Sequence, residues 1–473
     1  MNILAINKNG SYKNPNLVEY KIKIKLVKKI RITLTALLLI AGITIFGQMP
    51  PVVQRPQAPR PSTFGTPQPN VPSGMPSQTR PHQFQHHPNS GVDHYHADRE
   101  ARLRQQAMTE EIVREHIRRN RSIRYDLPPC VSSSEAHAYH YAFDKLSKMA
   151  DDTSFSISEA VFIIENAYYD NIGKFEVFDS GIKRIGSFIN TMMDQFGYDK
   201  QSNSAKNLML FQFFSDTLVN NKTKEISYPF EYDFEDFAAK EDLTKLFVSK
   251  TLRTRSGQCL SLPLLYLILA EEIGAKAHLA FSPEHSYIKF QTDEGKWQNV
   301  ELTNHMLTTD LHILSSGHVN AAAIQNKIYM HPLSQKQLLA SMFLHLSYGY
   351  VSKFCADNFA EQILDKALEL DPTNITALNG KLYFLTQRIN YVFEQLRPTQ
   401  ETIDQILAEN PRALKLLQTR SELGDRVDAL GYKEMTNEDY IKWVESAKVD
   451  KQTQELMRKS LQKMGIDVYK NRD

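Results

Sequence analysis

Cys259 stands where a polar segment meets an almost wholly apolar one. Residues 260–272 are mostly apolar and end before Gly274, which predicts a buried helix that begins at the cysteine. Pro263 fits the first turn of such a helix, because the N–H group that proline lacks would have no acceptor there. The positive end of the helix dipole favours a thiolate, and the free backbone N–H groups can receive an oxyanion. Cys259 is therefore a candidate nucleophile, with Gln258 as a candidate for oxyanion support.

A base and a carboxylate follow on a predicted β-hairpin. After Gly274 the hydrophobic period changes from helical to alternating, and residues 293–295, Asp-Glu-Gly, predict a three-residue hairpin loop. An odd loop length keeps the same parity in both strands, so that their odd-numbered residues share one face. His285 then lies either directly opposite Glu301 or one diagonal step away, within side-chain reach. Asn299, on the same face, is an alternative partner for the histidine.

These segments resemble the core of the transglutaminase-like superfamily. The matching text between residues 253 and 304 is SGQC followed by LSLPLLYLILAEEIGAKAHLA, then PEHSYIKF, then KWQNVELTN. It is similar in particular to bacterial SirB-one-type transglutaminase-like proteins that carry tetratricopeptide repeats. The resemblance implies a papain-like core in which Cys259 is the nucleophile, His285 its base and Glu301 the residue that orients the base. A peptide or protein amide would be the substrate.

Glu301 departs from the family pattern, which has Asp-Pro-Thr where this chain has Glu-Leu-Thr. A carboxylate that is one methylene longer must pull back or tilt to hold the same imidazole nitrogen, although glutamate fills this role in some other hydrolase triads. Two hypotheses stay open. The chain is an amide or peptide hydrolase, or a crosslinker if an amine replaces water. Alternatively, it is a catalytically degenerate interaction protein of the cell envelope, because a lone cysteine or histidine is more often structural.

The elements that carry these residues are preceded by a segment typical of export. Residues 32–47 are uncharged and mostly apolar, and they follow the basic residues Lys28, Lys29 and Arg31. We expect residues 1–47 to be a signal peptide or an N-terminal anchor, and either would place the body in the periplasm or outside the cell. If uncleaved, residues 32–47 would be the contact with the membrane.

Residues 48–95 hold eleven of the 21 prolines, which is typical of a disordered linker. The segment ends in five histidines, for which a polar linker is a better interpretation than a weak metal site, because no fixed backbone organises them. They are His82, His86, His87, His94 and His96.

Helices are predicted on both sides of the candidate catalytic segment, and one later segment resembles a repeat. Residues 367–380, ALELDPTNITALNG, are similar to the end of a tetratricopeptide repeat, a module that binds protein partners. Because a single repeat cannot bury both of its faces, we expect it to pack on the core. The periodicity indicates helices at residues 98–120, 136–149, 160–169, 180–196, 204–219, 240–252, 334–354, 358–370 and 382–396, and one capped by Thr436 or Asn437.

Composition excludes several classes of function. Residues 1–31 hold eight Lys/Arg and one acid, a net charge of +7 out of the total of +2. The rest of the chain therefore has a net charge near −5, which gives no reason to expect a nucleic acid partner. The chain contains no P-loop, no Gly-rich dinucleotide turn and no His-Glu-x-x-His motif, so no cofactor or metal is expected. Three cysteines are too few for a disulfide-built scaffold. Cys130 and Cys355 either pair in an exported chain or remain free thiols.

We therefore expect an α+β protein whose papain-like, transglutaminase-type core lies between mainly helical regions. The expected parts are a signal peptide or anchor (1–47), a linker rich in Pro, Gln and His (48–95), a helical region (96–250), the catalytic core (251–330), a tetratricopeptide-like region (331–398) and C-terminal helices (399–473).

Overall fold

The computed structural model describes residues 99–463 except 112–113, 115–121, 153, 238 and 316–318. The export segment and the proline- and histidine-rich linker lie outside the described residues. Residues 125–463 belong to one compact unit, and the described residues before 125, helical at 99–111, belong to another. In the described part of the chain, no helix is long and apolar enough to span a bilayer.

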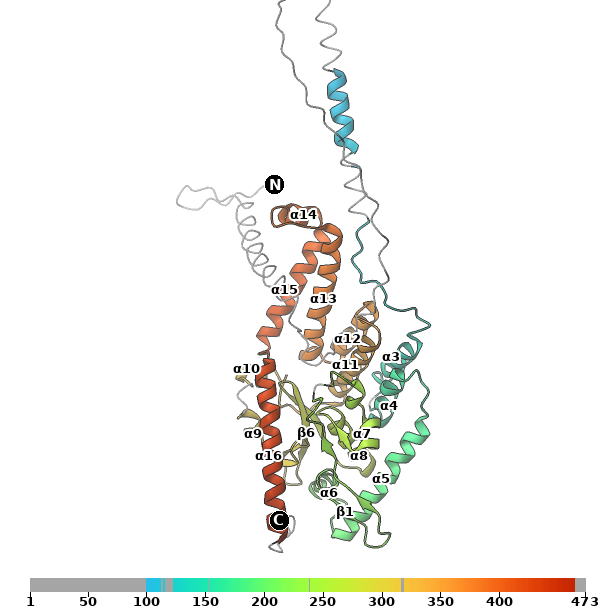
Figure 1. Ribbon diagram of the computed structural model, residues 1–473, viewed down its shortest axis with the longest axis vertical. Helices are drawn as coiled ribbons and strands as arrows, with labels where there is room; N and C mark the ends of the chain where they lie inside the picture. The colour runs from blue at the N-terminus through green and yellow to red at the C-terminus, as the bar shows by residue number, and fades with distance from the viewer. Residues whose placement is uncertain are drawn as a thin grey trace, which may run out of the picture. The chain divides into compact units, whose positions relative to one another are not determined.

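The unit from residue 125 onward is an α+β structure in which helices predominate (Figure 1). The helices before the main sheet are α3 (His137–Met149), α4 (Ile157–Tyr168), α5 (Phe175–Phe196), α6 (Asn203–Ser215), the 3-10 turn η1 (Leu243–Leu246), α7 (Val248–Thr254) and α8 (Ser261–Ile273). The helices after it are α9 (Asp310–Leu314), α10 (Ala321–Gln325), α11 (Gln335–Lys353), α12 (Asn358–Leu370), α13 (Ile375–Leu396), α14 (Ile403–Glu409), α15 (Pro411–Ala429) and α16 (Asn437–Lys463).

The main sheet is a four-stranded antiparallel meander with strand order β5-β6-β7-β8. Its strands are β5 (His278–Ser282), β6 (His285–Gln291), β7 (Trp297–Glu301) and β8 (Met306–Thr308). Lys289 lies opposite Asn299, so the odd-numbered residues of β6 and β7 share a face, as the loop length predicted. Two further strand pairs are short: β1 (Leu218–Val219) with antiparallel β2 (Ile226–Ser227), and β3 (Glu231–Tyr232) with parallel β4 (Ser256–Gly257).

The core of the unit is built around α8. Every residue of α8 from Ser261 to Ala270 is buried, which is why its sequence is apolar on all sides. Removing one such leucine or isoleucine side chain from water stabilises the fold by about 1.5–3 kcal/mol. Gly274 ends the helix with φ +67°, a left-handed conformation that favours glycine. The sheet places Ile288 and Phe290 of β6 in the same cluster of buried side chains.

Helices α11, α12 and α13, here called the repeat-like helices, pack on this core. α11 begins with a capping box formed by Ser334 and Gln337, and Asn374 caps α13. The largest cluster of buried residues runs from Leu127 to Phe384, so α11, α12 and α13 share it with α3, α4 and α8. The bounds of α12 are those of the helix predicted at residues 358–370. Helix α13 begins seven residues before its predicted start at 382, because Asn374 caps it there.

Other predicted helix boundaries were also wrong, and the helix expected at 180–196 begins five residues earlier, at Phe175. The helix expected at 204–219 ends at Ser215, because Leu218 and Val219 pair with β2 instead. The helix expected at 240–252 is the short turn η1 followed by α7, which runs on to Thr254. In these last two places backbone pairing or capping by distant residues outweighs the local helical pattern.

A disulfide joins Cys130, before α3, to Cys355, between α11 and α12, with their Cα atoms 5.9 Å apart. The backbone N–H of Cys130 also donates to Asp357 Oδ2 at 3.2 Å. The bond links segments that are 225 residues apart in the sequence. Because the chain has three cysteines, Cys259 is left as the free one.

Candidate active site

Cys259 lies in the turn that connects β4 to α8, one residue before the Leu260 N-cap. Gly257 precedes it at a point of close approach: a Cβ atom there would lie 2.6 Å from Thr251 Oγ1 and 2.7 Å from Ser261 Oγ. Ser261 Oγ accepts a hydrogen bond from the Gln258 N–H at 2.9 Å. Glycine is therefore required for the chain to enter α8 with Cys259 in this position.

Gln258 holds a neighbouring loop. Its side-chain amide is fully buried and donates to the carbonyl oxygens of Asp233, at 3.1 Å, and Asp236, at 2.8 Å. These bonds use the amide nitrogen that would otherwise be available to an oxyanion. The structure thus places Gln258 beside the candidate nucleophile, as an anchor for residues 233–242.

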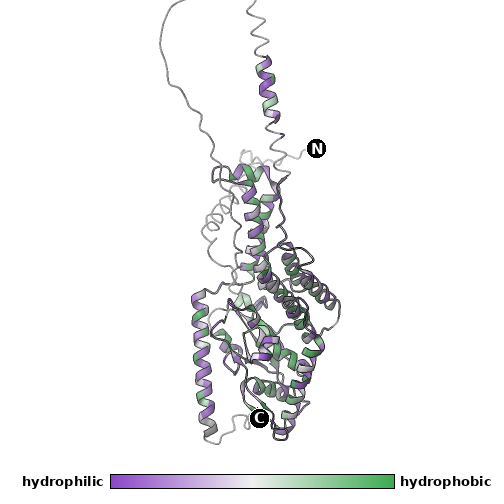
Figure 2. Cartoon of the chain, turned by 45° about the vertical axis from the view of Figure 1, so that its right-hand side comes forward, coloured by the Kyte–Doolittle hydropathy of each residue, from purple (hydrophilic) through white to green (hydrophobic). Residues whose placement is uncertain are grey.

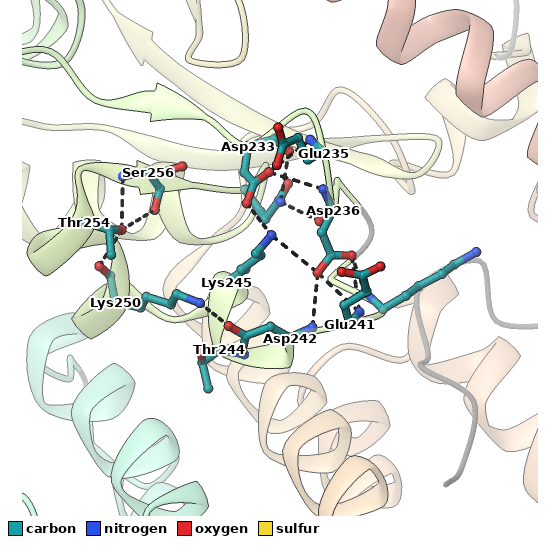
Figure 3. A network of polar contacts seen from close by, with 12 residues as sticks. Asp233, Glu235, Asp236, Glu241, Asp242, Thr244, Lys245, Lys250, Thr254 and Ser256 are labelled. Atoms are coloured by element: carbon teal, nitrogen blue, oxygen red, sulfur yellow. Dashed lines mark hydrogen bonds and ion pairs between the residues drawn. The ribbon is translucent and has the colours of Figure 1, made fainter.

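That loop is a compact polar network (Figure 3). The Lys245 ammonium group lies 2.7 Å from Asp233 Oδ2 and 3.7 Å from Asp236 Oδ2. Asp236 also accepts hydrogen bonds from the backbone N–H groups of Lys240 and Asp242, at 2.8 and 3.1 Å. Burial opposes ionisation of Asp233, but Lys245 and backbone N–H groups lower the pKa of that carboxyl. The network and the Gln258 amide together tie Asp233 and Asp236 to the Cys259 turn.

His285 and Glu301 form a buried hydrogen-bonded pair. His285 Nε2 lies 2.7 Å from Glu301 Oε2, and Glu301 Oε1 accepts from the Thr303 backbone N–H at 3.0 Å. Extending the strand register places Glu301 opposite Tyr287, so His285 lies one diagonal step away, one of the two arrangements that the hairpin allows. The structure therefore brings the histidine and the carboxylate together.

The electrostatics of this pair favour its charged form. Burial acts to lower the pKa of His285, but the Glu301 carboxylate and the Cys259 sulfur outweigh it and raise the pKa to about 10. Burial likewise opposes ionisation of Glu301, and the imidazolium outweighs it, so the pKa of Glu301 is lowered. At neutral pH the pair is an imidazolium next to a carboxylate.

Cys259 and His285 line the same cavity of about 120 Å³. Ser286 Oγ donates a hydrogen bond to the Cys259 carbonyl oxygen, which ties the start of β6 to the cysteine turn. Because Nε2 is bound to Glu301, His285 Nδ1 is the nitrogen left for the sulfur, and among the described residues it has no hydrogen-bond partner of regular geometry. Helices α11 and α13 supply the far wall of the cavity, with His345 and Asn379 among the lining residues.

Asn299, the alternative partner for His285, lies elsewhere. Its side-chain amide donates to Asp310 Oδ1 at 2.9 Å. The Lys289 ammonium group lies 2.6 Å from the same oxygen and also donates to the Met330 carbonyl oxygen at 3.1 Å. Asn299 therefore belongs to a polar cluster further along the sheet, and the group that contacts the histidine is Glu301.

The site also contains aromatic residues to which no sequence motif pointed. Burial raises the pKa values of Tyr232 and Tyr440, and the electrostatic influence of Cys259 adds to each rise. The Trp443 ring centroid is 4.5 Å from that of His285. Tyr232 comes from β3, whereas Tyr440 and Trp443 come from α16, more than 150 residues further along the chain. Nothing in their local sequence links them to Cys259.

The chain matches no family model, no curated protein and no solved structure. Within the residues that the structure describes, no group of three or more His, Cys, Asp or Glu side chains could hold a metal ion. The geometry of the cysteine, histidine and glutamate is therefore the basis for assigning a function.

Proposed function

We propose that this protein is a cysteine acyl-transfer enzyme with a papain-like, transglutaminase-type core, acting on a peptide or protein amide. The observation that carries the proposal is the buried His285–Glu301 pair, which leaves Nδ1 for the sulfur of a cysteine in the same cavity. A base held by a carboxylate and adjacent to a nucleophile is the arrangement that nucleophilic catalysis needs.

In the first half of the reaction, the Cys259 thiolate attacks the amide carbonyl carbon and forms the S–C bond. The imidazolium of His285 gives its Nδ1 proton to the leaving amine as the C–N bond breaks, which leaves a thioester and a neutral imidazole. The Cys259 backbone N–H is directed from the turn before α8 and is a donor for the oxyanion. Glu301 fixes the orientation of the imidazole and stabilises its charged form.

In the second half, neutral His285 accepts a proton from water as the water attacks the thioester. The S–C bond breaks, a carboxylic acid leaves, and the imidazolium and thiolate are restored. An amine in place of water would give a crosslink by the same steps. Hydrolysis is the simpler outcome, because water needs no binding site of its own.

The disulfide between Cys130 and Cys355 supports export, because such bonds persist in oxidising compartments. We therefore include a periplasmic or extracellular location in the proposal.

A thiol-directed activity probe on the full chain tests the function. We expect labelling of Cys259 and hydrolysis of peptide amides, and loss of both in Cys259→Ala; His285→Ala should slow labelling. If Cys259 is labelled no faster than Cys355 is after reduction of the disulfide, the catalytic function is wrong.

A second candidate function is favoured by the depth of the site. Cys259, His285 and Glu301 are only 7%, 5% and 4% exposed. Burial this deep is also consistent with a degenerate core retained for protein binding through helices α11–α13. Absence of turnover together with capture of a protein partner by α11–α13 would support this alternative.

A further inference from the structure

The segment that Gln258 anchors beside the Cys259 turn carries three aromatic side chains. Tyr232, Phe234 and Phe237, here called the aromatic wall, follow β3 and enter the loop at residues 233–242. The Tyr232 and Phe234 rings lie 4.9 Å apart. Asp233 and Asp236 are fixed by Lys245 and by backbone N–H groups, so contacts outside α16 help to hold the aromatic wall beside the Cys259 turn.

Helix α16 places two aromatic side chains on this wall. Tyr440 packs on Phe237 with ring centroids 5.4 Å apart, and Trp443 packs on His285 at 4.5 Å. Tyr440 and Trp443 stack on each other, with an interplanar angle of 5°. Tyr440 forms a small buried cluster with Met435 and Val444, and the partly buried Trp443 packs against it.

Outside that cluster, α16 is held by polar contacts. Lys451 pairs with Glu231, and Arg458 bonds to Asp216 and to the Ser215 carbonyl oxygen. Figure 2 shows α16 as a largely hydrophilic helix, in contrast to the interior helices. A helix fastened by one small apolar cluster and two largely buried ion pairs is suited to detach without unfolding the core.

The chain leading into α16 is fixed at one glycine. Gly431 has φ +90°, and a Cβ atom there would lie 2.5 Å from the Ala323 backbone nitrogen. Asn320 Nδ2 donates to the Gly431 carbonyl oxygen at 2.7 Å. Thr436 then caps α16 by accepting the Asp439 N–H at 3.1 Å. Gly431 is therefore a fixed point, and the segment from it to Thr436 connects that point to α16.

We propose that the aromatic wall is the acyl-donor subsite of this protein, and that it binds a polypeptide segment with an aromatic side chain, which displaces Trp443 of α16. This inference rests on the proposed function. In the resting chain, α16 occupies the subsite with its own Tyr440 and Trp443 and closes the approach to Cys259. The side chains that fill the subsite indicate its preference, because Tyr440 packs edge-on against the aromatic wall and Trp443 packs at a tilt against the imidazole.

The first test is the alkylation rate of Cys259 by iodoacetamide in the full chain, followed by mass spectrometry. We expect Trp443→Ala to raise the rate about tenfold or more, because the ring no longer covers His285. The matched control is Leu456→Ala, since Leu456 is 66% exposed on the same helix and should leave the rate unchanged. An unchanged rate in Trp443→Ala would show that α16 is a fixed part of the fold and would overturn the proposal.

The second test weakens the polar attachment without touching the aromatic residues. Lys451→Gln with Arg458→Gln should also raise the alkylation rate, and the rate in the unmodified chain should rise with salt. Lys442→Gln is the control, because Lys442 pairs with Glu438 of the same helix, on the exposed surface of α16. If the double variant and this control react at the same rate, α16 does not act as a displaceable cover. This variant also keeps the proposal testable if Trp443→Ala fails to fold.

The third test concerns the preference for an aromatic group. In Trp443→Ala, N-acetyltryptophanamide should protect Cys259 from iodoacetamide, whereas N-acetylalaninamide at the same concentration should not. Equal protection by the two amides would overturn the aromatic subsite. A different outcome separates this proposal from the proposed function. If Cys259 is alkylated faster in Trp443→Ala and is protected selectively by the aromatic amide, but no amide is hydrolysed, the enzymatic function is wrong and the aromatic subsite is supported.

Discussion

Glu301 has a longer side chain than aspartate, and its carboxylate still reaches His285 Nε2 at 2.7 Å. The second oxygen is held by the Thr303 N–H, which fixes the carboxylate from the other side. The extra methylene is thus accommodated by a backbone bond two residues later. This bond gives the carboxylate one orientation, which is what a residue that positions a catalytic base requires.

Substitution of Glu301 tests that role. Glu301→Gln should fold and yet lose roughly a hundredfold or more in acyl-transfer rate, because an amide can select the wrong imidazole tautomer and cannot stabilise the imidazolium. Glu301→Asp should keep activity, because the charge remains. Steady-state hydrolysis of a peptide amide measures both. A fully active Glu301→Gln enzyme would show that the glutamate has no role in the mechanism. Asn299→Ala is the control on the same strand, because Asn299 bonds to Asp310 and does not contact His285.

The raised pKa of His285 also makes a prediction about stability. With the pKa raised from 6.5 to about 10 in the folded chain, the imidazolium stabilises the fold fully below about pH 6.5, and this contribution is lost as the pH rises toward 10. The difference in free energy of unfolding between the natural chain and His285→Gln should therefore shrink between pH 6 and pH 9. Urea unfolding at a series of pH values measures it. A difference that is constant over this range would contradict the charged pair.

At the scale of elements, the site is assembled at the ends of β4, α8 and β6. The Cys259 turn is fixed by Gly257 behind it, by Ser261 inside α8 and by the Ser286 hydroxyl from β6. The loop at residues 233–242 supports the turn through Gln258. Each of these contacts joins segments that lie apart in the sequence, so the position of the sulfur depends on all of them.

Gly257→Ala tests the close approach at β4. The added Cβ would lie within 2.7 Å of two short side chains that have little room to move, so we expect a loss of about 1–3 kcal/mol in the free energy of unfolding. Gly424→Ala in α15 is the matched control, because no described atom lies within 4 Å of its new Cβ, and a helix interior gains about 0.5–1 kcal/mol from alanine. Equal effects in the two variants would refute the steric requirement.

At the scale of the whole molecule, one apolar cluster joins regions that the sequence pattern had separated. Buried residues from α3, α4, α8, α11 and α13 lie in it together. The disulfide between Cys130 and Cys355 closes the same assembly covalently. Helices α11 and α13 are therefore part of the wall of the candidate active site.

Loss of the disulfide should destabilise this assembly. Replacing both Cys130 and Cys355 by serine should lower the free energy of unfolding by about 2–5 kcal/mol, because a long loop of the unfolded chain is no longer constrained. A thermal melt with and without dithiothreitol provides the measurement: the reductant should lower the midpoint of the natural chain and leave the double variant unchanged. A midpoint of the natural chain that does not respond to reduction would mean that the bond does not stabilise the fold.

The sequence by itself determined the local parts of this protein. The apolar run before Gly274 predicted α8, the Asp-Glu-Gly loop predicted the hairpin, and the parity of that loop put His285 and Glu301 on one face. These features depend on hydrophobic periods and turn residues, which act over a few positions and are therefore visible in the sequence. The α+β class followed from the same patterns.

Only the tertiary structure decided what surrounds Cys259. The sequence left the partner of His285 open between Glu301 and Asn299. In the structure, His285 bonds to Glu301, whereas the side-chain amide of Asn299 bonds to Asp310. The sequence also contained no sign that Trp443 of α16 covers His285. Aromatic spacing in a helix shows that one face is buried but not which surface it meets, because that choice is made by packing between segments far apart in the chain.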